Sequence, residues 1–130
     1  MPEHPGQTYH ITAISTEKDL ERVLQLPKAI IYIQVSSSPH ERASRNVVFD
    51  ALQAAELHNI PVFKIDCTNH QQDFFENWLI LQSHHVHLFY YGGYGETLLV
   101  QDGLVTGFIN YPAKTGLEKT REAIAEWMNS

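Results

Sequence analysis

A serine, a histidine and a carboxylate stand close together at Ser38, His40 and Glu41. They follow an apolar run, residues 29–35, that is typical of a buried strand, and they open an amphipathic helix. A serine nucleophile needs a base within hydrogen-bond reach and a third group that orients the base. Ser38, however, is a good N-cap, Pro39 suits the first helical position, and Glu41 is placed to complete a capping box. The spacing therefore favours capping over catalysis, although the helix N-terminus still offers amides to an anion.

Histidines gather at His84, His85 and His87. On a strand, His85 and His87 share a face, because side chains repeat every second residue. That spacing can bind zinc, nickel or copper if His70 or an acid from elsewhere supplies a third ligand. The alternative is a polar, partly exposed segment. His85 and His87 are therefore candidate metal ligands, while no cofactor is expected.

The single cysteine, Cys67, follows a predicted strand that ends at Asp66. One cysteine excludes an intrachain disulfide and a cysteine-rich zinc site. A lone cysteine at a strand end is most often a small core residue. A reactive thiol needs a basic neighbour, and Lys64 points to the opposite face of the strand. Cys67 remains a candidate reactive thiol for a redox or acyl-carrying role.

An aromatic segment forms the strongest candidate binding surface, made of Phe89, Tyr90, Tyr91 and Tyr94. Tyrosine offers a large contact area with a polar tip, which suits protein interfaces. Glycines within the segment permit unusual backbone conformations. The alternative is that Phe89 and one tyrosine belong to the core and the rest form a loop.

The elements that must position these residues alternate between strand and helix, which favours parallel pairing with right-handed crossovers. An Asp-Gly pair then marks a hairpin turn, and a second capping box beginning at Thr115 opens a terminal helix. The predicted strands are 9–14, 29–35, 60–66, 97–100 and 104–109; the predicted helices start at Thr16, Ser38, Asp73 and Thr115, with Leu117, Ile124, Trp127 and Met128 inward in the last.

Composition limits the partners. The chain has 130 residues, 43% of them hydrophobic, and a formal charge of −6. This size and composition predict one domain over residues 1–130, with a loose leader over residues 1–8. Without a Lys/Arg cluster, nucleic acid and membrane are not expected as partners. No signal peptide or apolar run of about 20 residues is present, so we expect a cytoplasmic location.

From Ile11 to the end, this order of elements resembles the thioredoxin family. Residues 31–42 match the strand and active-site turn, residues 63–66 the next strand with its terminal acid, and residues 97–103 the hairpin. The spacing from Ser38 to Asp66 agrees with the family as well. The resemblance implies an α/β, three-layer sandwich with a central mixed sheet and a C-terminal helix.

The departures from the family pattern fall in its catalytic apparatus. Ser38 and Glu41 stand where the resemblance implies the two cysteines of Cys-x-x-Cys, so no thiolate nucleophile or resolving thiol is expected. Tyr32 replaces a buried carboxylate, and Glu96 replaces the cis-proline. The segment from 67 to 95 is an enlarged insert before the hairpin.

These observations predict a redox-inactive protein of thioredoxin fold that acts by binding a protein partner, or a second copy of itself. We do not expect a dithiol-disulfide oxidoreductase. The alternatives are a metal-binding protein or enzyme that uses His85 and His87, and a single-cysteine redox protein that uses Cys67.

Overall fold

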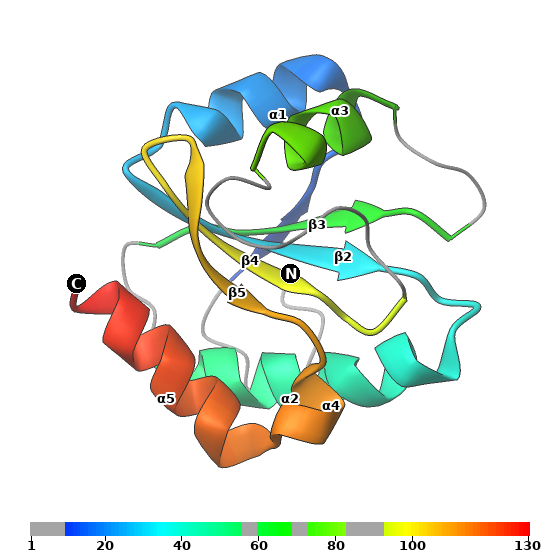
Figure 1. Cartoon of the computed structure of the whole chain (residues 1–130), viewed down its shortest axis with the longest axis vertical. Coiled ribbons are helices and arrows are strands. Elements are labelled where there is room, and N and C mark those ends of the chain that lie inside the picture. Colours follow the sequence, from blue (N-terminus) through cyan, green and yellow to red (C-terminus); the bar gives the residue numbers. More distant parts are fainter. Residues whose placement is uncertain (1–9, 56–59, 69–72, 83–92) are drawn as a thin grey trace.

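The computed structural model describes residues 10–55, 60–68, 73–82 and 93–130. Strands and helices alternate until β3, and a hairpin and two helices close the chain (Figure 1). The elements are β1 (Ile11–Ala13), α1 (Glu17–Leu24), β2 (Lys28–Gln34), α2 (Pro39–Ala54), β3 (Val62–Asp66), α3 (Asp73–Leu81), β4 (Thr97–Gln101), β5 (Leu104–Ile109), α4 (Pro112–Thr115) and α5 (Leu117–Met128). The predicted strands and long helices are confirmed, and the short helix α4 is an addition.

The sheet is mixed and five-stranded, in the order β1-β3-β2-β4-β5. β1 and β2 both run parallel to β3, because each connection to the next strand carries a helix. β4 runs antiparallel to both β2 and β5. The predicted central strand is β2, whose residues 29–33 are all buried.

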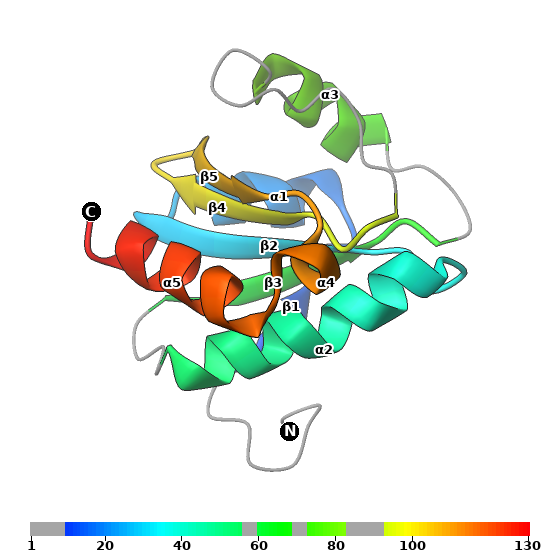
Figure 2. The ribbon, with the colours of Figure 1, turned by 60° about the horizontal axis from the view of Figure 1, so that its bottom comes forward.

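Helices cover both faces of this sheet and make three layers (Figures 1 and 2). α1 and α3 lie on one face, and α2, α4 and α5 lie on the other. Side chains of β2 alternate between the two cores, as a strand buried on both faces requires. The first core includes Leu20, Val23, Ile31, Ile33, Phe75 and Leu79; the second includes Ile30, Tyr32, Val48, Leu52, Ile124 and Trp127.

The three predicted helix caps differ in outcome. Thr16 caps α1, and Asp19 completes a capping box with it. Ser38 caps α2 as predicted, with Pro39 in the first turn. The predicted box at Thr115 is wrong, because Gly116 is the N-cap of α5 and makes no side-chain cap bond. The predicted inward position of Leu117 is also wrong, because this side chain is 41% exposed.

The β4–β5 turn takes the backbone that its Asp-Gly pair predicts. Asp102 and Gly103 both have positive φ, 52° and 81°. Two such residues in succession define the type I′ hairpin turn, whose twist matches that of the strands. The hairpin is therefore fixed by local turn chemistry.

Several predicted features lie partly or wholly outside the described residues, among them the leader over residues 1–8 and much of the insert over 67–95. In the described ranges, no helix has the length and apolar character that crossing a membrane requires.

The cap assignments of Thr16 and Thr115 can be tested by a matched pair of substitutions. Thr16→Ala removes a side-chain acceptor from Asp19 N–H, so we expect a loss of about 1 kcal/mol in the free energy of unfolding. Thr115→Ala removes a threonine that ends α4 and caps nothing, and we expect a change within about 0.5 kcal/mol. Urea denaturation measures both, and equal losses would contradict these cap assignments.

Candidate functional site

The turn from β2 into α2 holds a buried carboxylate. The Glu41 side chain is fully buried, although glutamate rarely enters a core unpaired. Its Oε1 accepts from the Val35 amide at 2.9 Å, and its Oε2 accepts from the Tyr32 hydroxyl at 2.5 Å. Arg45, one turn further along α2, contacts both oxygens at 2.9 and 2.5 Å. Every strong acceptor direction of this carboxylate is therefore used.

Glu41 does not complete the predicted capping box. The Glu41 carboxylate reaches the Val35 amide instead of the Ser38 amide, and the Ser38 amide donates to the Val35 carbonyl at 2.9 Å. The reason is electrostatic, because inside the fold the carboxylate gains a bidentate arginine and a buried hydroxyl. The sequence pattern therefore predicted the Ser38 cap correctly. The predicted second half of the box, in which the Glu41 carboxylate bonds the Ser38 amide, is wrong.

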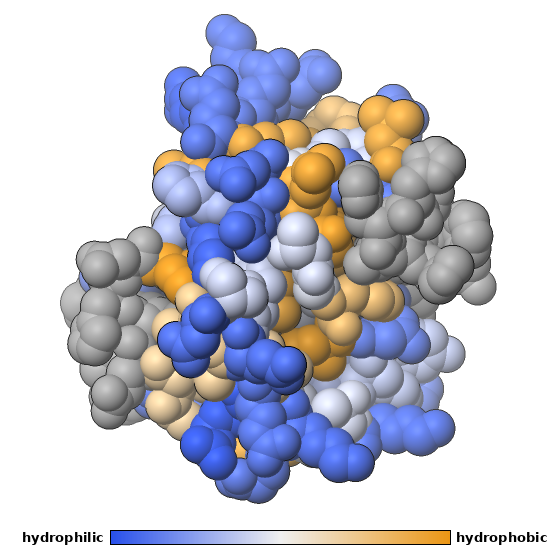
Figure 3. Space-filling view, turned by 60° about the vertical axis from the view of Figure 1, so that its left-hand side comes forward, coloured by the Kyte–Doolittle hydropathy of each residue, from blue (hydrophilic) through white to orange (hydrophobic). Residues whose placement is uncertain are grey.

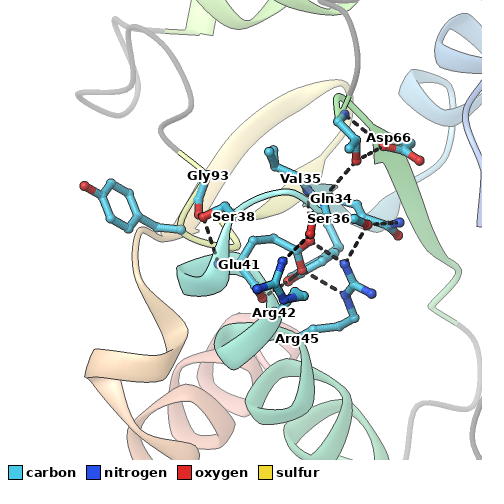
Figure 4. Close-up of polar contacts among 12 residues, drawn as sticks. Gln34, Val35, Ser36, Ser38, Glu41, Arg42, Arg45, Asp66 and Gly93 are labelled. Carbon is cyan, nitrogen blue, oxygen red and sulfur yellow. Dashed lines mark hydrogen bonds and ion pairs between the residues drawn. The ribbon is translucent and has the colours of Figure 1, made fainter.

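A polar network extends from this carboxylate along the ends of β2 and β3 (Figure 4). Arg45 also donates to the Ser36 hydroxyl at 3.1 Å, and Arg42 donates to the Ser36 carbonyl at 2.6 Å. The Ser36 amide donates to the Thr68 hydroxyl at 2.9 Å, and that hydroxyl donates to Asp66 at 2.5 Å. Two arginines of α2 thus bond the turn at Ser36, and Ser36 links the turn to the end of β3 through Thr68.

Ser38 is fixed by two bonds. Its hydroxyl accepts from the Glu41 amide at 3.4 Å and donates to the Gly93 carbonyl at 2.5 Å. Gly93 has φ of +79°, and a Cβ there would lie 3.2 Å from the Ser38 side chain. The segment before β4 therefore packs directly on the turn, and the serine hydroxyl donates to this segment instead of to a catalytic base.

The backbone before β4 is trans in the described residues, which contain no cis peptide bond. Glu96 occupies the position before the strand and is 1% exposed. Its carboxylate accepts from the Tyr94 amide at 3.0 Å, and its carbonyl accepts from the Ile33 amide at 3.1 Å. Glu96 therefore organises the loop that carries Tyr94.

Three aromatic side chains contact one another beside the turn between β2 and α2. They are His40 of α2, Tyr94 of the loop before β4, and Tyr111, which precedes α4. We call these three residues the aromatic surface. The Tyr94 and Tyr111 rings lie 4.8 Å apart, and His40 lies 5.3 and 5.6 Å from them, between centroids. His40 Nδ1 is 2.7 Å from the Tyr111 hydroxyl. Tyr94 is 36% exposed and His40 is also exposed.

Of the candidates from the sequence, the structure brings together those at the turn between β2 and α2, namely Ser38, His40, Glu41 and Tyr94. Phe89, Tyr90, Tyr91, His85 and His87 lie outside the described residues. The described ranges contain no group of three or more histidine, cysteine or acidic side chains that could hold a metal ion. The sequence analysis did not identify Tyr111. The available signal was Pro112, which is favoured at the first position of a helix and so marks Tyr111 as the residue just before α4.

Cys67 directly follows β3, and its side chain packs in the core on the opposite face of the sheet from α2. It is 7% exposed and belongs to the core beneath α1 and α3. Its amide donates to the Gln34 carbonyl at 2.8 Å, which extends the β2–β3 pairing by one residue. The thiol is therefore held in an apolar setting with little access to solvent.

Burial and the hydrogen bond to Glu41 raise the pKa of Tyr32 well above its usual 10.0. A raised pKa stabilises the fold fully below pH 10, and this contribution is lost as the unfolded chain ionises above that pH. We expect Tyr32→Phe to lower the free energy of unfolding at pH 7 by about 1–2 kcal/mol, through the lost hydrogen bond.

The same substitution should flatten the decline in stability above pH 10, by up to about 1.4 kcal/mol per pH unit. Urea unfolding of both proteins across this range measures the two slopes. Parallel slopes would show that the Tyr32 hydroxyl is not held protonated by the fold.

Comparison with known proteins identifies the fold. No protein-family model and no curated protein matches the sequence. Among solved structures, the chain is similar to thioredoxin f from spinach chloroplast, with TM-score 0.60, 13% identity and coverage of 91% of this chain and 86% of that one. A mutant thioredoxin from Halobacterium salinarum gives TM-score 0.58 and 15% identity, covering 90% and 89%.

A candidate oxidoreductase with a thioredoxin fold gives TM-score 0.64 at 7% identity, covering 88% of this chain and 93% of that one. The mixed five-stranded sheet with helices on both faces is consistent with such a fold. The chain is therefore an α/β protein with a thioredoxin-like fold, as predicted: a sandwich around a central mixed sheet, with a C-terminal helix.

Proposed function

We propose that this chain is a redox-inactive protein of thioredoxin fold that binds a protein partner through its aromatic surface. The observation that carries the proposal is the state of Ser38 and Glu41, the positions that match the family's dithiol. Neither residue has a thiol, and both side chains are engaged inside the fold. Disulfide exchange needs a thiolate that can attack a substrate sulfur.

The geometry of the aromatic surface supports binding. Its three residues come from separate segments, α2, the loop before β4 and the start of α4. Their rings contact one another, and the Glu96 and Ser38 hydrogen bonds hold the loop that presents Tyr94. A partner would meet an arrangement already formed, which reduces the entropy lost on binding. Tyrosines of this kind are frequent among the residues that dominate interfaces.

Phe89, Tyr90 and Tyr91 remain candidate members of the same surface, since they precede Tyr94 in the chain. A second copy of the chain is one form that the partner can take. The metal and single-cysteine alternatives have less support. Burial of Cys67 opposes rapid thiol exchange, which needs access for the attacking or leaving sulfur. The metal alternative would need His85 and His87 with a third ligand.

Selection from a random peptide library displayed on phage tests the proposal, because it requires no identified partner. The target is the native chain, and selected peptides are then measured against the double variant Tyr94→Ser, Tyr111→Ser. We expect at least about a tenfold loss of affinity, because truncating a central aromatic at an interface typically costs about 1–2 kcal/mol. Circular dichroism and urea denaturation establish that the variant is folded.

Leu117→Ser is the matched control, because it removes an exposed apolar side chain from the start of α5. It should leave the affinity of the selected peptides unchanged. If the peptides bind the tyrosine variant as tightly as the native chain, the aromatic surface is not the binding site. If the native chain forms a dimer that the tyrosine variant does not, sedimentation identifies the partner as a second copy.

A further inference from the structure

A second surface of the molecule is hollowed between β5 and α5. The groove has a volume of about 300 Å³, at the lower end of the range for ligand pockets. Residues 106–109 of β5 form one wall, and Ala123, Glu126 and Trp127 of α5 form the other. Figure 3 looks from the side of the hairpin and the C-terminus, and apolar side chains gather across the middle of this face, with hydrophilic ones above and below them. None of the residues that line this groove belongs to the aromatic surface.

β5 is the last strand of the sheet, and in the described part of the chain β4 is its one strand neighbour. An edge strand presents backbone N–H and C=O groups that can pair with another strand. At the start of β5 the Val105 amide donates to the Gln82 side chain at 2.9 Å. The strand edge next to the groove begins just beyond this bond, at residue 106.

Contacts between the walls of the groove, and with residues next to them, fix its shape. The Trp127 indole is 6% exposed and donates to the Thr106 hydroxyl at 2.9 Å, which joins α5 to β5. Lys28 contacts the same tryptophan in two ways. Its ammonium group lies 5.2 Å from the centroid of the indole ring and donates to the Trp127 carbonyl at 3.0 Å. Gly107 leaves the wall without a side chain, and a Cβ there would lie 2.8 Å from Leu99. Glycine at this position leaves room for the Leu99 side chain of the neighbouring strand.

The charge of the groove and of the whole chain indicates which kind of partner segment can bind here. β5 has no charged residue between Leu104 and Ile109, and the lining residues of the groove include one, the exposed Glu126. The whole chain carries a net charge of −6. A second copy would bring another uncharged β5 on an acidic body, because a two-fold interface pairs a surface with itself. A basic segment would complement both Glu126 and the overall charge.

We propose that this groove binds an extended, basic segment of a partner protein, which adds to β5 as a further strand. Bonds to those backbone groups of residues 106–109 that face away from β4 provide affinity. An apolar side chain enters the groove against Trp127, and a flanking lysine or arginine lies near Glu126. This site is independent of the aromatic surface and would survive failure of the function proposed above.

Two blocked synthetic peptides test the proposal by NMR on the ¹⁵N-labelled chain. One alternates lysine with valine, and the other alternates glutamate with valine. We expect saturable shifts from the lysine peptide in the amides of residues 106–109 and in the Trp127 indole N–H. Affinity for the glutamate peptide should be at least about threefold lower, the effect of a single exposed ion pair.

Glu126→Lys should reverse this preference, and Glu21→Lys, an equal charge change on the exposed side of α1, should keep it. Shifts that spread over acidic surfaces without reaching β5 would overturn the proposal, as would no binding, or equal effects of the two variants. Shifts of the same amides that depend on protein concentration without peptide would identify a second copy as the occupant, and would also overturn it.

Discussion

A carboxylate placed inside a protein must be neutralised, and the burial of Glu41 is the constraint on which the arrangement of β2, α2 and the turn between them depends. Taking such a charge out of water costs several kcal/mol unless an opposite charge and hydrogen bonds replace the solvent. Here Arg45, Tyr32 and the Val35 amide supply them. Because these three groups come from α2, β2 and the turn between them, satisfying one carboxylate fixes how strand, turn and helix meet.

The turn between β2 and α2 in turn positions the segment before β4, which carries Tyr94. Ser38 is held at the start of α2 and donates to the Gly93 carbonyl, so the segment before β4 is bonded directly to the turn. Glu96, the second buried carboxylate, then bonds the Tyr94 amide. Two buried acids, Glu41 and Glu96, therefore hold the segments that carry the aromatic surface. In the thioredoxin-like fold this is the end of the sheet where strand, turn and helix converge, and here hydrogen bonds to carboxylates organise it.

Much of the fold was predictable because its signals are local. The apolar run of β2, the Thr16 cap and the Asp-Gly turn each depend on neighbours in sequence, and all three are confirmed. Glu41 shows the limit of such reasoning. Its position favoured a capping box, but Tyr32 competes for the carboxylate from nine residues away. The contact between His40 and Tyr111, which are 71 residues apart, has no local signal. Candidate sites built by long-range contacts therefore needed the structure.

We propose that this chain uses the thioredoxin-like fold without thiol chemistry. The most direct measurement is catalysis of insulin disulfide reduction by dithiothreitol, with native protein and Cys67→Ser compared at equal concentration. We expect neither protein to exceed the uncatalysed rate, because Ser38 and Glu41 provide no thiolate and Cys67 is 7% exposed. Catalysis by the native chain that disappears in Cys67→Ser would contradict this proposal and would establish a single-cysteine redox protein.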